Sequence, residues 1–214
     1  MTLDVYADIA CPWCSIGEAH LRAALRQRPR LRATVRWRPF QLQPGIPKGG
    51  LPLRPFFTDK FGGEAAMAAA FAHVEQAGEA AGVPFDFSRL AGAPNTLDAH
   101  RVVLLGAERG RTWETARALF DGYFAHGGDL SSPEALAEMA TGAGLDAREV
   151  AEMLAGDRFR DEVEASQREA AALGVRGVPF VVFGGRYGVS GAQPPEAFVR
   201  ALDAAAGVPT APGA

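Results

Sequence analysis

The chain has 214 residues, of which 48% are hydrophobic, so it can bury a large core as one domain or as a domain with an insertion. Its formal net charge is −3 and it has no run of Lys or Arg, which argues against a nucleic-acid-binding surface. No stretch approaches the roughly 20 apolar residues that cross a bilayer. The segment Met1–Val5 has neither the basic nor the apolar character of a secretory signal, so we expect a cytoplasmic protein.

The first part of the chain is predicted to form strand, helix and strand. Apolar and polar residues alternate over residues 3–9, the period of two that is typical of a strand. Over residues 13–25, apolar residues recur at spacings of three and four, which predicts an amphipathic helix that ends by Pro29. A second alternation, over residues 33–38, predicts another strand. Because a crossover helix joins them, we expect the two strands to be parallel.

The middle of the chain is predicted to be helical. Proline and glycine are dense over residues 39–55, so we expect a connecting loop without regular structure there. From about Asp59 to Gly174 the sequence is rich in alanine and poor in β-branched residues, and we predict roughly five or six helices and no strand. Ser132 followed by Pro133 is typical of a helix start.

Strand patterns return near the C-terminus. The apolar run 178–183, the glycine pair 184–185 and residues 186–189 predict a β-hairpin. A last helix is expected from about Pro195, and the tail 209–214 is expected to be frayed. The order β-α-β, helical block, β-β-α predicts an α/β fold whose sheet is interrupted by a helical insertion. The predicted divisions are residues 1–44 for the first part of the sheet domain, 45–174 for the helical insertion and 175–214 for the second part.

The two cysteines, Cys11 and Cys14, flank Pro12 and Trp13 where the first strand meets the first helix. A disulfide across two residues constrains little of the unfolded chain, so a lone pair in a reducing compartment favours redox chemistry. We expect Cys11 to face solvent, where the open N–H groups of the helix start stabilise its thiolate, and Cys14 to be a shielded resolving thiol. Pro12 suits the first helical position, and Trp13 contributes no charge.

Two other interpretations of the cysteine pair stay open. The cysteines could be incidental small apolar residues, or they could bind a metal ion. A metal site within one chain needs about four ligands. We predict no metal site, because no metal-binding spacing links the cysteines to the four histidines, His20, His73, His100 and His126.

Val178 and Pro179 open the strand that follows the helical block. Proline in a strand gives up a ladder hydrogen bond. A cis Val178–Pro179 bond would place this turn beside the cysteines and leave the Val178 backbone to pair with an extended substrate. Taken alone, Pro179 fits an ordinary trans proline at a strand start.

Five segments together resemble the FrnE-like branch of the DsbA family. They are DIACPWC (8–14), WRPFQL (37–42), NTLDAHR (95–101), GVPF (177–180) and SGAQ (190–193). The resemblance covers nearly the whole chain and implies a thioredoxin-like fold with a large all-helical insertion. It also implies Cys11 as nucleophile, Cys14 as resolving thiol and Pro179 as the active-site cis-proline. Pro12, Trp13 and Val178 are then expected to contact the substrate.

The chain departs from this branch at two points. Ser15 follows the second cysteine where relatives often have an aromatic residue, so the edge of the site is expected to pack differently. Some relatives have a second cysteine pair near the C-terminus, and this chain has none. Any electron relay must therefore use Cys11, Cys14 or an external thiol.

Three polar residues have both a functional and a structural interpretation. Asn95 and His100 would hold a substrate or a small thiol if their helix faces the cysteines. Alternatively, Asn95 caps that helix and His100 is a partly buried helix residue. Asp8 would tune the cysteines by proton exchange, or it is a polar residue at a strand edge.

The leading functional hypothesis is a thiol–disulfide oxidoreductase, of the protein disulfide reductase or isomerase type, that works through a mixed disulfide. Its partners would be thiols and disulfides of proteins or small molecules, with no tightly bound cofactor and with glutathione as a candidate co-substrate. The second hypothesis is a glutathione-dependent isomerase or transferase related to 2-hydroxychromene-2-carboxylate isomerase, which Cys11 argues against because those enzymes generally have serine there. The third is a non-enzymatic peptide-binding chaperone.

Overall fold

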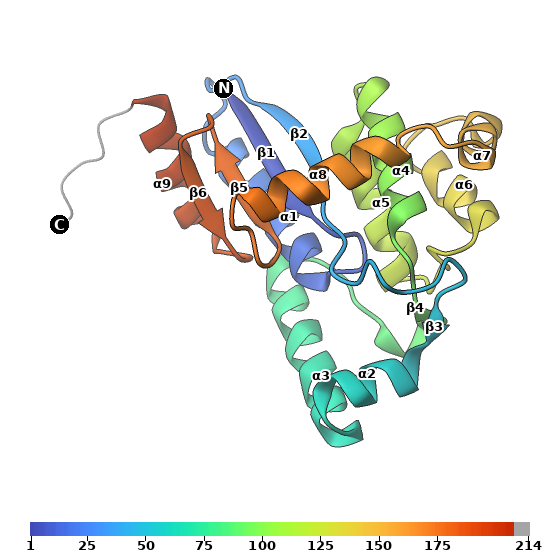
Figure 1. The fold of residues 1–214 in the computed structure, drawn as a ribbon. Helices are drawn as coiled ribbons and strands as arrows, with labels where there is room; N and C mark the ends of the chain where they lie inside the picture. The colour runs from blue at the N-terminus through green and yellow to red at the C-terminus, as the bar shows by residue number, and fades with distance from the viewer. Residues whose placement is uncertain (208–214) are drawn as a thin grey trace.

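A computed structural model describes residues 1–207, and its four-stranded sheet has the order β2-β1-β5-β6 (Figure 1). Strand β1 (Thr2–Ala7) leads into α1 (Pro12–Arg26), and the chain returns as β2 (Thr34–Pro39). Strands β1 and β2 are parallel, with Val5 opposite Trp37. The predicted strand–helix–strand unit is therefore confirmed.

The C-terminal part completes the sheet. Strand β5 (Phe180–Phe183) pairs antiparallel with β1 on one side and with β6 (Tyr187–Ser190) on the other. Helix α9 (Pro195–Ala206) follows and packs against α1. The predicted hairpin and last helix are confirmed, whereas the expectation for the tail 209–214 lies outside the described residues.

Strand β1 is buried on both of its faces. Leu3 and Val5 face the main core, while Tyr6 packs on the other face against Ala170 of α8 (Arg160–Ala172), the helix that crosses in front of β1 in Figure 1. The buried carboxylate of Asp4 accepts hydrogen bonds from Arg36 and Arg38 of β2. Burial raises the pKa of Asp4, but these two bonds outweigh burial and hold the pKa below its ordinary value of 3.8.

The insertion contains more regular structure than the sequence predicts. Its seven α-helices are α2 (Leu53–Phe61), α3 (Glu64–Ala81), α4 (Leu97–Glu108), α5 (Thr112–Phe124), α6 (Pro133–Thr141), α7 (Ala147–Ala155) and α8 (Arg160–Ala172). It also has a short 3-10 helix (Phe87–Arg89) and a pair of two-residue strands, β3 (Leu51–Pro52) and β4 (Gly92–Ala93).

Two expectations were therefore wrong: β4 lies where no strand was expected, and β3 and the start of α2 lie in the stretch 39–55, which was expected to have no regular structure. The predicted five or six helices between about Asp59 and Gly174 are confirmed, because the six helices α3 to α8 lie within those bounds. Helix α2 starts inside the predicted loop, because Pro52 caps it and Pro55 lies in its first turn. Proline is tolerated there because the N–H groups of a first turn have no partner within the helix.

One continuous hydrophobic core joins the sheet to the insertion. It includes Leu3 and Phe183 of the sheet as well as Leu105 and Phe120 of the insertion, all at most 1% exposed. The fold is thus an α/β thioredoxin-like fold with a helical insertion, as predicted. The exact domain divisions at 44 and 174 stay a prediction. In Figure 1, α2 and α3 extend away from the sheet as an arm. None of the helices described is long and apolar enough to cross a membrane.

Candidate active site

The cysteine motif begins at the N-terminus of α1. Cys11 is the N-cap residue, with extended backbone angles, and Pro12 is in the first helical turn as predicted. No side chain caps this turn, the turn has no acidic residue, and the Cys14 N–H donates to the Cys11 carbonyl at 3.0 Å. Cys11 is only 4% exposed, so the expectation that it faces open solvent was wrong. It instead lines a cavity described below.

Cys14 lies one turn inward, and both thiols are free. It is 2% exposed, and burial raises its pKa well above the ordinary value of 9.0. A hydrogen bond to Cys11 and the negative charges of Cys11 and Asp8 raise this pKa further. The geometry agrees with a shielded second thiol whose proton is retained because the thiol is buried.

The turn that precedes β5 lies directly beside Cys11. The Val178–Pro179 peptide bond is cis, and the Cys11 thiol donates to the Val178 carbonyl oxygen at 3.7 Å. The Pro179 ring packs against α1 at Gly17, where an added Cβ would lie 2.8 Å from the Pro179 Cγ. Residues separated by about 160 positions thus form one site. Val178, Pro179 and the cysteines come together as expected, and their roles stay a prediction.

Asp8 connects the site to a buried polar chain. Its carboxylate accepts from the backbone N–H of Leu42 at 2.7 Å and lies 3.3 Å from Nε2 of His100. The contact between Asp8 and His100 does not have the geometry of a hydrogen bond, so it is an electrostatic contact. The indole N–H of Trp37 donates to Nδ1 of His100 at 3.1 Å. Asp8 is 2% exposed, so it is more deeply buried than a polar residue at a strand edge would be.

His100 and Asn95 do not line the cavity at Cys11. His100 is fully buried and reaches the site only through Asp8. The Asn95 side chain donates to the Ile46 carbonyl at 2.6 Å and accepts from the Leu97 N–H at 2.9 Å. Thr96, not Asn95, is the N-cap of α4, although Asn95 still satisfies one N–H of its first turn. Asn95 therefore fixes the loop before β3, and substrate contact by these two residues stays a prediction.

A cavity of about 330 Å³ opens at Cys11, between the start of α1 and the α2–α3 arm. Asp8, Cys11 and Trp13 line one part of it, and Lys60 lies on the part formed by α2. The remaining lining is mostly apolar and includes six phenylalanines from segments far apart in sequence, namely Phe56, Phe57, Phe61, Phe71, Phe87 and Phe124. These residues were not predicted from the sequence, although the three phenylalanines within α2 were a visible signal.

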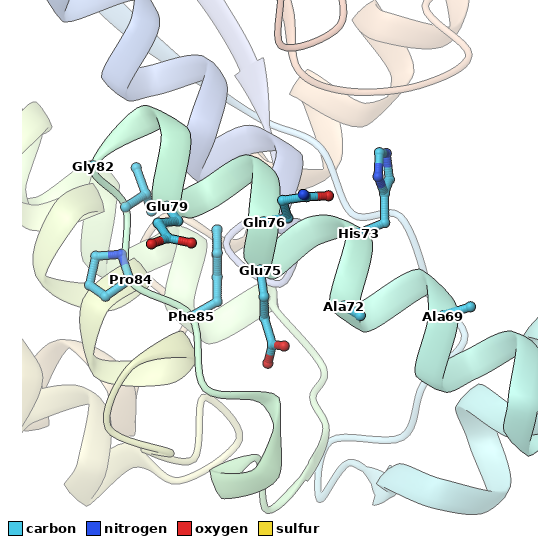
Figure 2. Close-up of a pocket in the computed structure, with 10 residues that line it drawn as sticks. Ala69, Ala72, His73, Glu75, Gln76, Glu79, Gly82, Pro84 and Phe85 are labelled. Carbon is cyan, nitrogen blue, oxygen red and sulfur yellow. The ribbon is translucent and has the colours of Figure 1, made fainter.

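Trp13 is 36% exposed and forms part of the rim. Its ring lies 5.5 Å from the ring of His73 on α3. A wider and shallower hollow follows α3 and shares only His73 with this cavity (Figure 2). In Figure 2, Glu75 and His73 point to different sides of α3. The hollow lacks both cysteines, so we assign the chemistry to the cavity.

The described residues contain no group of three or more His, Cys, Asp or Glu side chains that could hold a metal ion. The fold, the dithiol at a helix N-terminus and the adjacent cis-proline together define a thioredoxin-fold protein with a redox-type site.

Comparison with known proteins agrees with this class. The family profile described as DSBA-like thioredoxin domain matches residues 2–203. The chain belongs to this family, the DsbA-like thiol–disulfide oxidoreductases. A structure described as a probable DsbA oxidoreductase from Streptomyces coelicolor is 38% identical, with a TM-score of 0.87 over 100% of this chain and 93% of that chain. No curated protein matches the sequence.

Two more distant structures share the fold. The cytosolic disulfide reductase DsbM from Pseudomonas aeruginosa is 19% identical, with a TM-score of 0.63 over 95% of this chain and 98% of that chain. A 2-hydroxychromene-2-carboxylate isomerase is 15% identical, with a TM-score of 0.70 over 97% of this chain and 95% of that chain.

Proposed function

We propose that this protein, as an FrnE-like member of its family, reduces or isomerises disulfides in the cytoplasm through Cys11 and Cys14. One observation carries the proposal. Cys11 is the N-cap of α1, its sulfur lies 3.7 Å from the Val178 carbonyl, and the buried Cys14 lies one turn inward, with its backbone N–H donating to the Cys11 carbonyl at 3.0 Å. A nucleophile, a resolving thiol and a backbone edge for the substrate are thus together.

The first step uses the open end of α1. The Cys11 thiolate attacks one sulfur of a substrate disulfide, a mixed disulfide forms, and the second substrate sulfur leaves as a thiolate. The attacking sulfur lies at the N-terminus of α1, where the helix dipole presents positive partial charge to negatively charged groups. Pro12 provides no N–H at its position, which leaves the start of the helix open without an unsatisfied donor.

The second step depends on Cys14. A negative Cys11 is one of the causes that raise the pKa of Cys14. Once Cys11 is bound in a mixed disulfide, its charge is gone, so Cys14 loses its proton more readily. The Cys14 thiolate then attacks the Cys11 sulfur, releases the substrate as a thiol and leaves a Cys11–Cys14 disulfide. Cys14 is therefore activated after the substrate has been captured.

An insulin-reduction assay tests the dithiol assignment. We expect Cys11→Ser to lose nearly all activity, while Cys14→Ser accumulates a mixed disulfide detectable by mass spectrometry. Full activity of Cys11→Ser would refute the assignment. For the direction of the reaction, a reduction potential near the strongly oxidising value of about −120 mV would contradict a reductase or isomerase.

Glutathione is proposed as the thiol that regenerates the dithiol, with no tightly bound cofactor. The reducing glutathione pool of the cytoplasm supports this role, and the Pseudomonas aeruginosa reductase with the same fold was solved with GSH. A glutathione-reductase-coupled assay should show turnover that requires Cys11. Lack of turnover would point to a protein reductant.

A glutathione-dependent isomerase is the second candidate. The observation in its favour is the cavity of about 330 Å³ beside Cys11, which suits a small molecule, in a fold shared with a 2-hydroxychromene-2-carboxylate isomerase. Stable glutathione binding to the reduced protein, measured by calorimetry, would favour this candidate. Absence of binding would remove it.

A further inference from the structure

We propose that the cavity at Cys11 binds a small aromatic anion, a compound of about two rings with one acidic group, as the thiol or disulfide substrate. The proposal rests on the proposed function, since it names the substrate class of the same site. It is carried by the size of the cavity, its lining and the position of its charges.

The size of the cavity matches two aromatic rings. A buried apolar cavity of about 150 Å³ holds one benzene molecule. The cavity at Cys11 is about 330 Å³, near the lower end of the range for ligand sites of roughly 300 to 1,000 Å³. It therefore suits a bicyclic compound better than a large cofactor.

The lining favours a flat apolar body. Phe71 and Phe87 stack at 4.4 Å with an interplanar angle of 14°, and Phe57 meets Phe71 edge-on at 5.4 Å. These rings form a packed aromatic wall opposite the Cys11 motif. An aromatic ligand can add to such a wall by offset or edge-to-face contact, which contributes more than buried area alone.

The charges of the lining fix the orientation of the ligand. In the described part of the chain, Lys60 is the sole Lys or Arg of the cavity, and its Nζ lies 5.9 Å and 5.6 Å from the rings of Phe56 and Phe57. No carboxylate of residues 1–207 forms an ion pair with Lys60. The sole acidic side chain of the lining is Asp8, beside Cys11. An anion is thus attracted to α2 and repelled from Asp8, which directs the acidic group to Lys60 and the sulfur to Cys11.

The same features disfavour the other occupants. Glutathione carries two carboxylates, whereas the lining has a single cation, so stable binding inside the cavity would bury one carboxylate without a partner, although glutathione can still react transiently as a thiol. An extended polypeptide can pair with the Val178 backbone beside Cys11, but inside the cavity the phenylalanine wall offers no partners for its N–H and C=O groups. One aromatic anion leaves no such group unsatisfied.

In an aromatic disulfide R–S–S–R each R carries one acidic group, one R occupies the cavity, and the reaction has two steps. The Cys11 thiolate attacks one sulfur, the Cys11–S–S–R bond forms, the bond between the reagent's sulfurs breaks and one R–S⁻ leaves. Cys14 gives its proton to solvent and attacks the Cys11 sulfur, which releases the second R–S⁻. Two electrons pass from the dithiol to the reagent, and the protein is left with a Cys11–Cys14 disulfide.

Equilibrium binding provides the first test. Reduced wild-type protein is titrated with naphthoate and with naphthamide, its uncharged counterpart, by calorimetry. We expect one saturable site and about tenfold tighter binding of naphthoate. Lys60→Gln should bring the ratio of the two dissociation constants to about one. Lys48→Gln removes the other lysine of the chain, which pairs with Asp98 outside the cavity, and should keep the wild-type ratio.

Kinetics provide the second test. The rate of reaction of Cys11 is measured with dithiobis(nitrobenzoate), an anionic aromatic disulfide, and with uncharged dithiodipyridine. We expect Lys60→Gln to lower the ratio of the two rates about tenfold. The ratio cancels any general effect of the lysine on the Cys11 thiolate. Lys48→Gln again serves as the matched control.

The proposal is overturned if wild-type protein binds naphthoate and naphthamide equally, if neither binds, or if a phenylalanine-containing peptide competes and naphthoate does not. These outcomes are distinct from failure of the proposed function. If insulin reduction requires Cys11 but naphthoate does not bind, the dithiol assignment stands and the substrate class is wrong. If naphthoate binds but Cys11→Ser keeps full activity, the cavity is a binding site and the redox function is wrong.

Discussion

Trp37 donates its indole N–H to Nδ1 of His100 at 3.1 Å, and both side chains are buried. The bond fixes the tautomer, because a ring nitrogen that accepts a proton donor carries no proton of its own when the imidazole is neutral. The proton then resides on Nε2, the atom that faces Asp8. The contacts from Trp37 through His100 to Asp8 therefore connect β2 and the start of α4 to a residue three positions before Cys11.

We expect Trp37→Phe to lower the free energy of unfolding by about 1–3 kcal/mol, because Nδ1 of His100 loses its donor in a buried site. His100→Ala should lower it by about 2–4 kcal/mol, since a cavity is added to an unpaired indole N–H. Denaturant unfolding of both variants and of the double variant measures the coupling. Strict additivity of the two effects would show that the hydrogen bond contributes nothing.

We expect the replacement of Arg101 to have a larger effect on the free energy of unfolding. Its guanidinium is fully buried and donates to Asp98 and to the carbonyl oxygens of Met153, Gly156 and Arg158. Arg101→Met would leave these carbonyl acceptors unpaired and the buried Asp98 carboxylate with Lys48 as its remaining ion-pair partner. We expect a loss of about 3–5 kcal/mol in the free energy of unfolding.

The control for Arg101 is Arg168→Met on α8, where the arginine is mostly exposed and lies 3.8 Å from Glu164. A surface pair of this kind contributes about 0–1 kcal/mol. Similar losses for both variants in thermal unfolding would contradict the role of Arg101 in holding the loop between α7 and α8.

We expect a substitution at Gly17 to lower the activity without changing the cysteines themselves. An added Cβ at this position would lie 2.8 Å from the Pro179 Cγ and 3.5 Å from the Ala192 Cα, so Gly17→Ala must displace α1 from the Pro179 turn. We expect kcat/KM for disulfide reduction to fall about tenfold or more, because small shifts of reacting groups are expensive. Gly45→Ala, with open space around the added Cβ, should leave it unchanged. Equal activity of the two variants would refute the close packing.

Cys14 makes the stability of the reduced protein depend on pH. Its pKa is raised in the folded state, chiefly by burial, so the folded protein keeps a proton that the unfolded chain loses above the ordinary value of 9.0. The contribution of Cys14 to stability is therefore fully present below pH 9.0 and declines as the pH rises above it. Denaturant unfolding in the presence of reductant should show the stability difference between wild type and Cys14→Ser falling at alkaline pH. A difference independent of pH would contradict the raised pKa.

The sheet and the cysteine pair could be predicted because their signals are local. The alternation in β1 and β2, the cysteines before Pro12 and the glycine turn before β6 each act within a few residues. The site around Cys11 also includes Val178 and Pro179. The low frequency of cis X–Pro bonds did not by itself favour a cis bond there. The family resemblance placed them there, and the structure confirmed the cis bond.

The cavity could not be predicted because its lining is assembled from distant segments. Phe71 and Phe87 come into contact through the turn after α3, and neither lies near the cysteines in sequence. The role of Asn95 was also hidden, since its partner is the Ile46 carbonyl in a loop with no regular pattern. Helix α2 was missed because its prolines fall at the positions where a helix start accepts them.

The continuous core has a consequence for how this protein loses its structure. Phe120 of α5 packs edge-on against Trp37 of β2 at 6.3 Å, so the helical block and the sheet share the same buried contacts. Removing either part would expose apolar surface on the other. The two parts should therefore melt together in one cooperative transition, and the insertion cannot be exchanged between relatives as a free-standing module.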